Sequence, residues 1–433
     1  MMFWEKEIET MPVPELRAMQ VGRLREMVDR AARTPYYGEL FGRLGLSAGR
    51  IKSLDDLKRI PFTTKEDLRG HFPYGFLATP SEDVVRMHSS SGTTGNPTVV
   101  YHTRRDLDMW ANLVARCMVM TGVHKGDVFQ NMMGYGLFTG GIGLHYGAEK
   151  VGVMVIPAGA GNSKRQIWLM RNFGTTVVHI IPSYALKLAT VSEAEDVDPK
   201  KDVKLRIALI GAEPHSEAIR RRIEEIYALD AFNSYGLSEM NGPGVAFECP
   251  EKKGMHVWED SYILEVIDPE TLEPVPDGEE GELVFTTLNR EAMPIFRYRT
   301  RDLAFVYPEP CACGRTHRRI ARIKGQTDDM LIIKGVNVFP VQVERTLMAF
   351  PEVGNNYVIV LEKVGPMDGM IVRIEVRNEI LQGGIRHLDD LRRRIVRALS
   401  DEILFTPKVE LVEPGSLPTT EGKAVRVIDR RAE

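Results

Sequence analysis

The sequence has no long apolar run and no export signal at its start. No run of about 18 apolar residues, the length that a membrane-spanning helix needs, occurs in the 433 residues. The opening stretch, MMFWEKEIET, is acidic where a secretory signal is basic and then apolar. These absences argue against a membrane protein and a secreted one, and we expect a cytoplasmic location.

Cysteine is scarce as well. Four cysteines are too few to form a disulfide scaffold in a chain of this length. Three of them, Cys249, Cys311 and Cys313, stand in polar, turn-like sequence, which indicates a metal site. Cys117 stands in an apolar helical stretch, and we expect it in the core.

Neither sign of charge is in large excess. The 56 basic and 60 acidic residues leave a net charge of −4, which offers no general attraction for nucleic acid. An anionic ligand must therefore be bound by local groups. Because 43% of the residues are hydrophobic, we expect a folded chain, and its length predicts two or three compact domains, one of them large.

The middle of the sequence alternates short apolar runs with amphipathic stretches. The runs cover 151–156, 177–181 and 205–210 and are rich in valine and isoleucine, whereas 164–173 and 217–227 have helical spacing. Strands of this kind separated by helices predict a buried, mostly parallel sheet of the α/β class.

The sequence after about residue 255 has a different pattern. Two predicted strands, 262–267 and 282–287, are separated by a turn rich in proline and glycine, which predicts an antiparallel subdomain. The last part again mixes strands and helices, typical of a small α+β domain. We predict an N-terminal domain of residues 1–327 and a C-terminal domain of residues 328–433.

One segment is rich in glycine and hydroxyl side chains. Residues 89–98 read SSSGTTGNPT and lie between two apolar stretches. Glycines let backbone amides approach an anion, and the hydroxyls donate to phosphate oxygens. The Walker pattern of P-loop nucleotide hydrolases is absent. Taken alone, the segment has the composition of a phosphate-binding loop and equally of a polar hairpin tip.

Further motifs follow this loop in a fixed order. They are NSYGLSE at 233–239, YRTRD at 298–302, the segment 325–340 and PTTEGK at 418–423. With the loop, they resemble the adenylate-forming superfamily of acyl-CoA synthetases, most closely the phenylacetate-CoA ligase family. The resemblance runs from about residue 85 to the end of the sequence. It implies a large N-terminal adenylate-forming domain and a small, mobile C-terminal domain.

The resemblance also implies a two-step reaction. The carboxylate of an aryl acid attacks the α-phosphorus of ATP, which gives an acyl-adenylate and pyrophosphate. The thiol of coenzyme A then displaces AMP. The implied cofactors are ATP, Mg²⁺ and coenzyme A, with neither a nucleic acid nor a membrane as partner, and a homodimer is expected by analogy.

The resemblance assigns many residues to ATP. The loop binds the β and γ phosphates, Tyr235 and Gly236 flank the adenine, and Asp302 accepts both ribose hydroxyls. Glu239 supplies a hard oxygen ligand to Mg²⁺. The positions expected to contact ATP are Ser89, Ser90, Ser91, Gly92, Thr93, Thr94, Gly95, Gly211, Ala212, Glu213, Pro214, Asn233, Ser234, Tyr235, Gly236, Ser238, Asp302 and Ile323. Considered singly, Glu239 and Asp302 are also typical of solvated residues at element ends.

The C-terminal motifs are expected to contribute a catalytic group and a hinge. Lys423 matches the lysine that reaches the substrate carboxylate and the α-phosphate, although a lone lysine near a chain end is ordinarily solvated. Asp328 matches the pivot of the domain movement. Relatives generally have arginine where Gln326 stands, which leaves open whether the hinge makes a charged contact to the nucleotide.

The stretch 131–141 resembles the segment that lines the acid pocket of phenylacetate-CoA ligases. Its candidate pocket residues are Tyr135, Phe138 and Gly140, with the rings contacting an aryl group and the glycine leaving room for it. The alternative is that both aromatic residues are core. The sequence does not identify the acid beyond its aryl class.

Cys249, His256, Cys311 and Cys313 form a Cys₃His set suited to a closed, structural zinc site. His317 competes with His256 for the fourth position. The alternative is that the cysteines are free and bind no metal.

The sequence leaves two other functions open. One is adenylation of an acid with transfer to a carrier protein or another acceptor instead of coenzyme A. The other is a zinc-containing interaction protein that binds a nucleotide without turnover.

Overall fold

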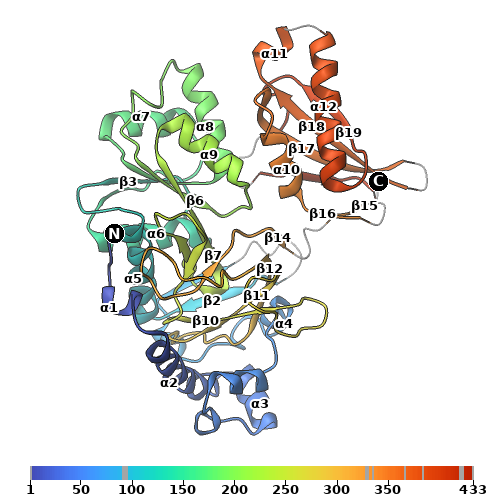
Figure 1. Cartoon of the computed structure of the whole chain (residues 1–433). Helices are drawn as coiled ribbons and strands as arrows, with labels where there is room; N and C mark the ends of the chain where they lie inside the picture. Colours follow the sequence, from blue (N-terminus) through green and yellow to red (C-terminus); the bar gives the residue numbers. More distant parts are fainter. Residues whose placement is uncertain are drawn as a thin grey trace. The chain divides into compact units, whose positions relative to one another are not determined.

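A computed structural model describes residues 2–89, 96–326, 331–333, 336–364, 367–382, 385–418 and 424–431. Two compact units make up the chain (Figure 1). Unit 1 comprises Met1–Gly159, Thr175–His179 and Phe232–Arg322, and unit 2 comprises Ala160–Gly174, Ile180–Ala231 and Ile323–Glu433. The predicted domain boundary at Asp328 lies outside the described residues and stays a prediction.

The helices of unit 1 lie mostly in its first half. They are α1 (Lys6–Glu9), α2 (Val13–Ala31), α3 (Pro35–Leu44), η1 (Ala48–Arg50), η2 (Leu54–Arg59), α4 (Lys65–Gly70), η3 (Ser81–Asp83), α5 (Arg104–Met120), α6 (Thr139–Val151) and η4 (Ser238–Met240). Local sequence sets their ends. At α3, the Thr34 hydroxyl accepts from the Tyr37 amide, and Gly45 ends the helix in the left-handed region.

The strands centred on unit 1 form parallel and antiparallel sets. They are β1 (Arg86–Ser89), β2 (Val99–His102), β3 (Val128–Asn131), β4 (Met154–Ile156), β5 (Val177–Ile180), β7 (Asp230–Leu237), β8 (Gly242–Glu248), β9 (Met255–Val257), β10 (Tyr262–Ile267), β11 (Gly281–Thr287), β12 (Tyr298–Ala304) and β13 (Arg319–Ile320). Strand β3 pairs in parallel with β4 and β5, as the α/β prediction requires. Strands β7, β8, β9 and β13 pair antiparallel in that order.

The predicted antiparallel subdomain is confirmed. Strands β10, β11 and β12 form an antiparallel meander, in which Tyr262 faces Thr287. The prediction for 151–156 is wrong in part, because α6 continues to Val151 and β4 begins only at Met154. Gly152 ends the helix with a φ of 87°, a conformation that a residue with a side chain rarely adopts.

Unit 2 contains helices α7 (Ser163–Phe173), α8 (Pro182–Ala194), α9 (Glu217–Tyr227), α10 (Pro340–Met348), α11 (Asn378–Gln382) and α12 (Ile385–Ile403). Its strands are β6 (Ile207–Gly211), β14 (Gly325–Gln326), β15 (Leu331–Ile333), β16 (Val336–Val338), β17 (Val353–Val364), β18 (Met367–Val376), β19 (Lys408–Val412) and β20 (Val427–Asp429). The structure confirms the helices predicted over 164–173 and 217–227.

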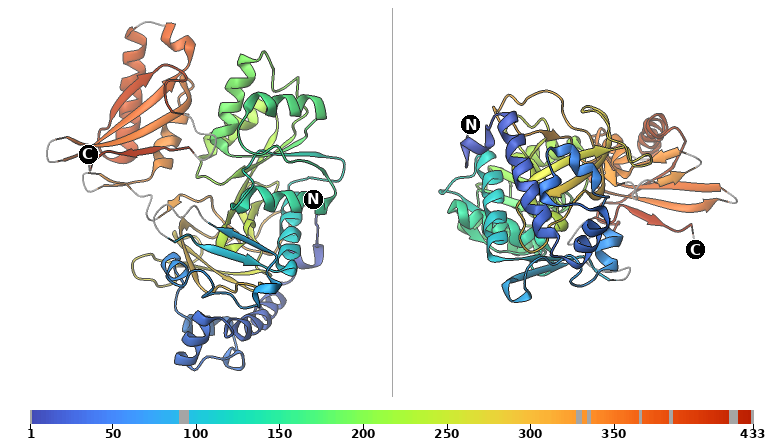
Figure 2. Two further views of the ribbon diagram at one scale, coloured as in Figure 1. Left: turned by 180° about the vertical axis from the view of Figure 1, so that it is seen from behind. Right: turned by 90° about the horizontal axis from the view of Figure 1, so that it is seen from below.

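The C-terminal part of unit 2 has its own core. Its sheet has the strand order β19-β18-β17-β20, antiparallel between β17 and β18 and parallel at both outer pairs. Helix α12 packs on this sheet (Figure 2) and buries Leu391, Ile395 and Leu399 at four-residue spacing. Burying each such side chain contributes about 1.5–3 kcal/mol. The predicted small α+β domain is therefore present.

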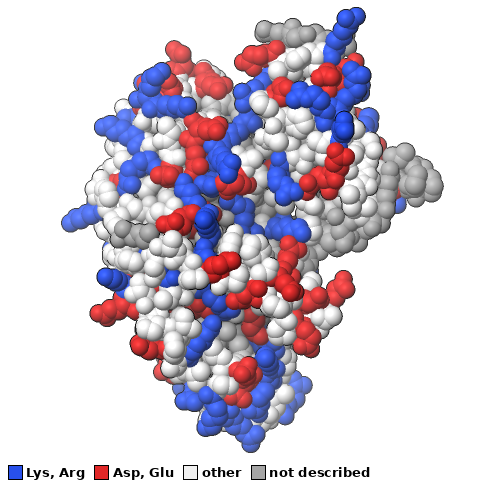
Figure 3. Space-filling view, in the orientation of Figure 1, with Lys and Arg blue, Asp and Glu red and all other residues white. Residues whose placement is uncertain are grey.

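Charges of both signs are mixed over the face seen in Figure 3, without a large area of one sign. This distribution agrees with the net charge of −4. Among the described residues, no helix has the length together with the apolar character needed to span a bilayer.

Candidate active site and candidate metal centre

Glu239 lies in a polar cluster in unit 1. It belongs to η4, the turn that follows β7, and only 8% of it is exposed. The Tyr298 hydroxyl donates to its Oε1 at 3.0 Å, and the Thr98 hydroxyl lies 3.5 Å from the same oxygen. Thr98 is the last residue of the glycine-rich segment, so the described end of that segment meets the predicted metal ligand.

Asp302 belongs to the same cluster. The Tyr235 hydroxyl donates to its Oδ2 at 2.6 Å, and its own amide donates to the Thr300 hydroxyl. Tyr298 and Asp302 stand four residues apart on β12, and the charges of both Glu239 and Asp302 act on the Tyr298 hydroxyl. The structure therefore brings together the two carboxylates that the sequence assigned to Mg²⁺ and ribose.

Both tyrosines remain hydroxyl donors at neutral pH. Burial, followed by the nearby charge of Asp302, raises the pKa of Tyr235 well above its usual value. Burial and the charge of Glu239 do the same for the pKa of Tyr298. Each carboxylate therefore accepts a hydrogen bond from a neutral O–H donor.

The NSYGLSE segment also requires its glycine. A Cβ on Gly236 would lie 2.0 Å from the carbonyl oxygen of Gly242, closer than real atoms approach. In the same segment, the Ser238 hydroxyl lies 3.1 Å from that of Thr139, the first residue of α6.

Two other predicted positions lie on β7. Asn233 is buried, and its backbone amide donates to the Glu248 carboxylate at 2.7 Å. Ser234 pairs with Phe247 in β8.

The predicted acid pocket lies at the start of α6. Tyr135 is 39% exposed and Phe138 is 49% exposed, so neither is a core residue. Asn131 donates to the Tyr135 hydroxyl at 2.9 Å, and His145 Nδ1 lies 3.2 Å from it on the other side. Gly140 has Phe138 and a methionine at ordinary contact distance from where a Cβ would stand.

One carbonyl joins this pocket to the start of the phosphate-binding loop. The Leu137 oxygen accepts from the Ser89 amide at 3.1 Å and from His88 Nδ1 at 3.0 Å. Because a carbonyl can only accept, His88 carries its proton on Nδ1. The loop and the acid pocket therefore share a backbone connection.

The candidates of unit 2 cluster after β6. Gly211, the last residue of β6, leads into Ala212, which has a φ of 68°. The Glu213 carboxylate accepts from the Ser183 amide at 2.7 Å and from the Ala424 amide at 3.1 Å. The residue that follows the predicted catalytic lysine thus lies beside the segment 211–214, which includes Pro214. Ile323 is half-buried at the first position of the C-terminal segment.

Several predicted site residues lie outside the described residues: Ser90, Ser91, Gly92, Thr93, Thr94, Gly95, Asp328 and Lys423. Their roles stay predictions. Sequence reasoning in turn missed Thr98 and Tyr298 as contacts of Glu239. Thr98 ends the segment 89–98 and Tyr298 begins the motif 298–302, so the motifs themselves marked both residues as candidates.

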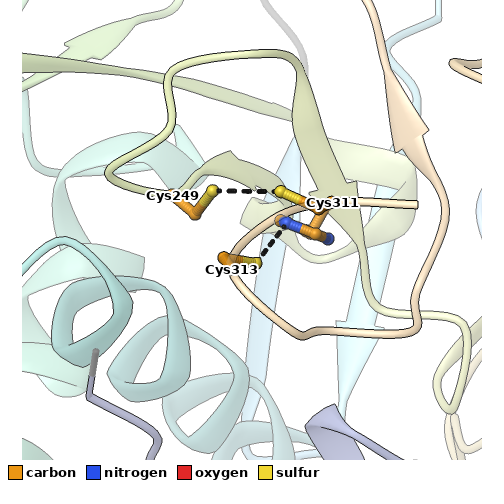
Figure 4. Close-up of side chains that lie close together, drawn as sticks. Cys249, Cys311 and Cys313 are labelled. Carbon is orange, nitrogen blue, oxygen red and sulfur yellow. Dashed lines mark hydrogen bonds between the residues drawn. The ribbon is translucent and has the colours of Figure 1, made fainter. Parts of the chain in front are cut away.

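The cysteine cluster forms as predicted. The ligand atoms of Cys249, His256, Cys311 and Cys313 all lie within 4.8 Å of one another. Cys249 Sγ and Cys311 Sγ are 3.7 Å apart, and Cys313 Sγ lies 3.2 Å from His256 Nε2 (Figure 4). A tetrahedral zinc ion with bonds of about 2.3 Å to sulfur has sulfur–sulfur edges of about 3.8 Å. The donor set and its spacing therefore fit zinc.

The structure decides between the two histidines. His256 Nδ1 donates to the backbone carbonyl of His317 at 3.0 Å, which leaves the Nε2 lone pair facing the cysteines. Both ring nitrogens of His317 are already used, since Nδ1 accepts from the Glu259 amide and Nε2 donates to the Ile8 carbonyl. His256 is therefore the histidine of the cluster.

The loop that carries Cys313 also holds the start of the chain. Arg315 donates to the Glu9 carboxylate at 2.7 Å, and both side chains are fully buried. The Thr316 amide donates to the Glu9 carbonyl at 3.2 Å.

Cys117 lies outside the cluster and is buried, as predicted. Burial raises its pKa to about 12, and Trp258 donates to its sulfur at 3.1 Å.

Comparison with known proteins places this geometry in a family. The family model described as AMP-binding enzyme matches residues 51–289, and that of the AMP-binding enzyme C-terminal domain matches residues 335–431. The chain is 46% identical to phenylacetate-coenzyme A ligase of Thermus thermophilus, over 99% of this chain and 100% of that one. The chain belongs to the phenylacetate-CoA ligase family. It is also 41% identical to the Escherichia coli K12 ligase, over 98% and 97% of the two chains.

Solved structures support the same assignment. A 2-hydroxyisobutyryl-CoA ligase in complex with 2-HIB-AMP has a TM-score of 0.94 and 30% identity, over 99% of this chain and 93% of that one. A benzoate CoA ligase from Burkholderia xenovorans, with 20% identity and a TM-score of 0.59, shares the fold. The predictions of an adenylate-forming fold and of an AMP-forming acid–thiol ligase that uses ATP and coenzyme A are confirmed. Transfer to a carrier protein is not favoured.

Proposed function

We propose that this ligase activates phenylacetate, or an aryl acid very similar to it, and transfers the acyl group to coenzyme A. The observation that carries the proposal is the shared cluster of Glu239 and Asp302, each buried and each bound by a tyrosine hydroxyl. Glu239 contacts Thr98 at the end of the phosphate-binding segment, and Ser238 contacts the first residue of α6. Nucleotide, metal and acid would therefore meet in unit 1.

In this proposal, Glu239 binds Mg²⁺ through its carboxylate. The ion would neutralise phosphate charge while pyrophosphate leaves. Tyr298 orients the carboxylate by donating to one oxygen, which leaves the second oxygen for the ion. Asp302 binds the ribose hydroxyls, and Tyr235 fixes its rotamer.

Tyr135 and Phe138 are proposed to contact the aryl ring of the acid. Offset or edge contacts between aromatic rings contribute about 0.5–1.5 kcal/mol per pair beyond burial. The Leu137 carbonyl, bound by Ser89, keeps this pocket beside the phosphate-binding loop. That connection would hold the acid carboxylate near the α-phosphate.

We also propose that residues 328–433 act as a mobile domain with Asp328 as its pivot and Lys423 as its catalytic residue. The match of the C-terminal family model to residues 335–431 supports this division. The Cys₃His cluster is proposed to bind one structural zinc ion, because a site with four protein ligands leaves no position for substrate. A homodimer and a cytoplasmic location stay predictions.

Pyrophosphate release tests the function directly. The protein is incubated with ATP, Mg²⁺ and phenylacetate, benzoate, 4-hydroxyphenylacetate or 2-hydroxyisobutyrate, with and without coenzyme A. We expect sustained turnover only with coenzyme A present, the highest kcat/KM with phenylacetate, and phenylacetyl-CoA as the product detected by mass. Sustained turnover on a pantetheinylated carrier protein, with none on coenzyme A, would contradict the proposal.

Replacing Asp302 with asparagine is expected to raise the KM for ATP about tenfold to a hundredfold. An amide accepts through one oxygen and has no charge, and hydrogen bonds to a charged group are worth about 1.5–3 kcal/mol. The KM for phenylacetate should change little. Asp277→Asn, in an exposed turn of the same unit, is the matched control and should behave as wild type. An unchanged KM for ATP in Asp302→Asn would remove this residue from the ribose site.

A further inference from the structure

Arg290 is a buried cation to which the proposed reaction assigns no role. Its side chain is 0% exposed and lies on the segment between β11 and β12. Nη1 donates to the backbone carbonyl of Glu239 at 2.8 Å, and Nη2 donates to that of Tyr101 at 3.0 Å. Within the described part of the chain, its Nε has no hydrogen-bond partner.

Arg116 shows how a buried arginine is usually stabilised. It is 1% exposed and donates to the Asp260 carboxylate at 2.7 Å, with Glu5 on its other side. Among the described residues, Arg290 instead binds two backbone carbonyls. The charges of Asp106 and Glu239 attract it from a longer range, so its direct contacts are with the backbone.

The two carbonyls belong to the two segments that the proposed site must keep together. Tyr101 lies on β2, which begins directly after Thr98, and the Glu239 carbonyl lies on the turn that carries the proposed metal ligand. A guanidinium is a planar fork with fixed directions, so binding both carbonyls sets the spacing between the segments.

The backbone next to Arg290 is held in place by hydrogen bonds to Asp106. The amides of Glu291 and Ala292, which follow Arg290 in the chain, donate to the Asp106 carboxylate at 2.7 and 2.9 Å. Asp106 is fully buried near the start of α5. Arg290 therefore projects from a backbone segment that is anchored to a helix.

We propose that Arg290 is a positioning residue for adenylate formation. By binding both carbonyls, it holds the Glu239 turn at a fixed distance from β2, the strand that begins directly after Thr98, so that Glu239 and Thr98 stay in contact at the proposed Mg²⁺–ATP site. The inference rests on the role proposed above for Glu239. It assigns Arg290 to the first half-reaction alone, because thiolation of a preformed acyl-adenylate requires no pyrophosphate to leave.

The test compares Arg290→Lys and Arg290→Gln with Arg116→Lys, a conservative change at another buried arginine. Pyrophosphate release is measured against Mg²⁺ concentration, and thiolation is measured with supplied phenylacetyl-AMP and coenzyme A. We expect both Arg290 variants to lose about tenfold in the rate of adenylation and to need at least about threefold more Mg²⁺ for half-saturation. Thiolation should stay within about twofold of wild type.

Several outcomes would overturn the positioning role of Arg290. Equal loss in both half-reactions, or a loss no larger than that of Arg116→Lys, would overturn the positioning role. Failure of both Arg290 variants to fold would assign the residue to stability and overturn it as well. Glu239→Gln is measured alongside: if its Mg²⁺ dependence is unchanged, the proposed metal ligand is wrong and both proposals fall. If only the Arg290 variants are unaffected, the inference on Arg290 alone is wrong.

Discussion

Replacing Lys423 with alanine is expected to slow adenylate formation by about a hundredfold to a thousandfold. In the proposed reaction, its ammonium group stabilises the negative charge that builds on the α-phosphate as the carboxylate attacks. Losing one such donor in a transition state costs about that factor. Thiolation of supplied phenylacetyl-AMP should proceed at nearly the wild-type rate, since this lysine acts only in the first step. Pyrophosphate release and thioester formation, measured separately, give the two rates.

Lys408 provides a matched control for this prediction. It stands on β19 in the same C-terminal part of the chain, is exposed, and pairs with Glu410 at 2.7 Å. Lys408→Ala should leave both half-reactions unchanged. If Lys423→Ala lowers both rates by the same factor, the lysine does not have the specific role proposed here.

Loss of metal is expected to have the second largest effect. Zinc binding to a Cys₃His site supplies folding free energy directly, and removing one ligand leaves buried thiolates without their cation. We expect about one zinc ion per chain in gently purified protein. In Cys313→Ser, we expect little zinc and a melting temperature lower by on the order of 10 °C. Elemental analysis and thermal denaturation check both points.

Cys117→Ser separates this effect from the general cost of altering a buried cysteine. Cys117 is buried but lies outside the cluster, so its variant should keep the zinc content of wild type. Wild-type protein without zinc, together with an unchanged melting temperature in Cys313→Ser, would show that the four residues form no metal site.

The sequence predicted those elements whose local pattern admits one interpretation. Helix α9 follows from apolar residues at helical spacing, and the β10–β11 hairpin follows from its proline- and glycine-rich turn. The run 151–156 admits two interpretations, because a short apolar run is equally typical of a strand and of the end of a buried helix. Only the left-handed Gly152 separates the two there.

The motifs likewise named the two carboxylates but could not pair them with their donors. Tyr235 binds Asp302 and Tyr298 binds Glu239, so each tyrosine binds the carboxylate of the other motif. This pairing depends on how β7 and β12 lie in space. The choice of His256 over His317 depends in the same way on a backbone carbonyl that no sequence pattern marks. Arg290 stands outside every quoted motif, so only its contacts reveal it.

Domain limits depend on packing over long distances in the sequence. Motif order predicts a boundary at Asp328, whereas compactness groups residues 160–174 and 180–231 with the C-terminal segment. A linear pattern carries no information on which of two neighbours a subdomain contacts more. The boundary at Asp328 therefore stays a prediction.

Residues near the start of the sequence contact the loop that carries Cys313, which restricts how they can be modified. Glu9 and Ile8 bind the loop that carries Cys313, through Arg315 and His317. The first turn of the polypeptide is therefore part of the outer support of the cysteine cluster and not a loose extension. A label, tag or fusion partner joined ahead of residue 2 would therefore act on the loop that carries Cys313, and a short flexible spacer is the way to separate the two.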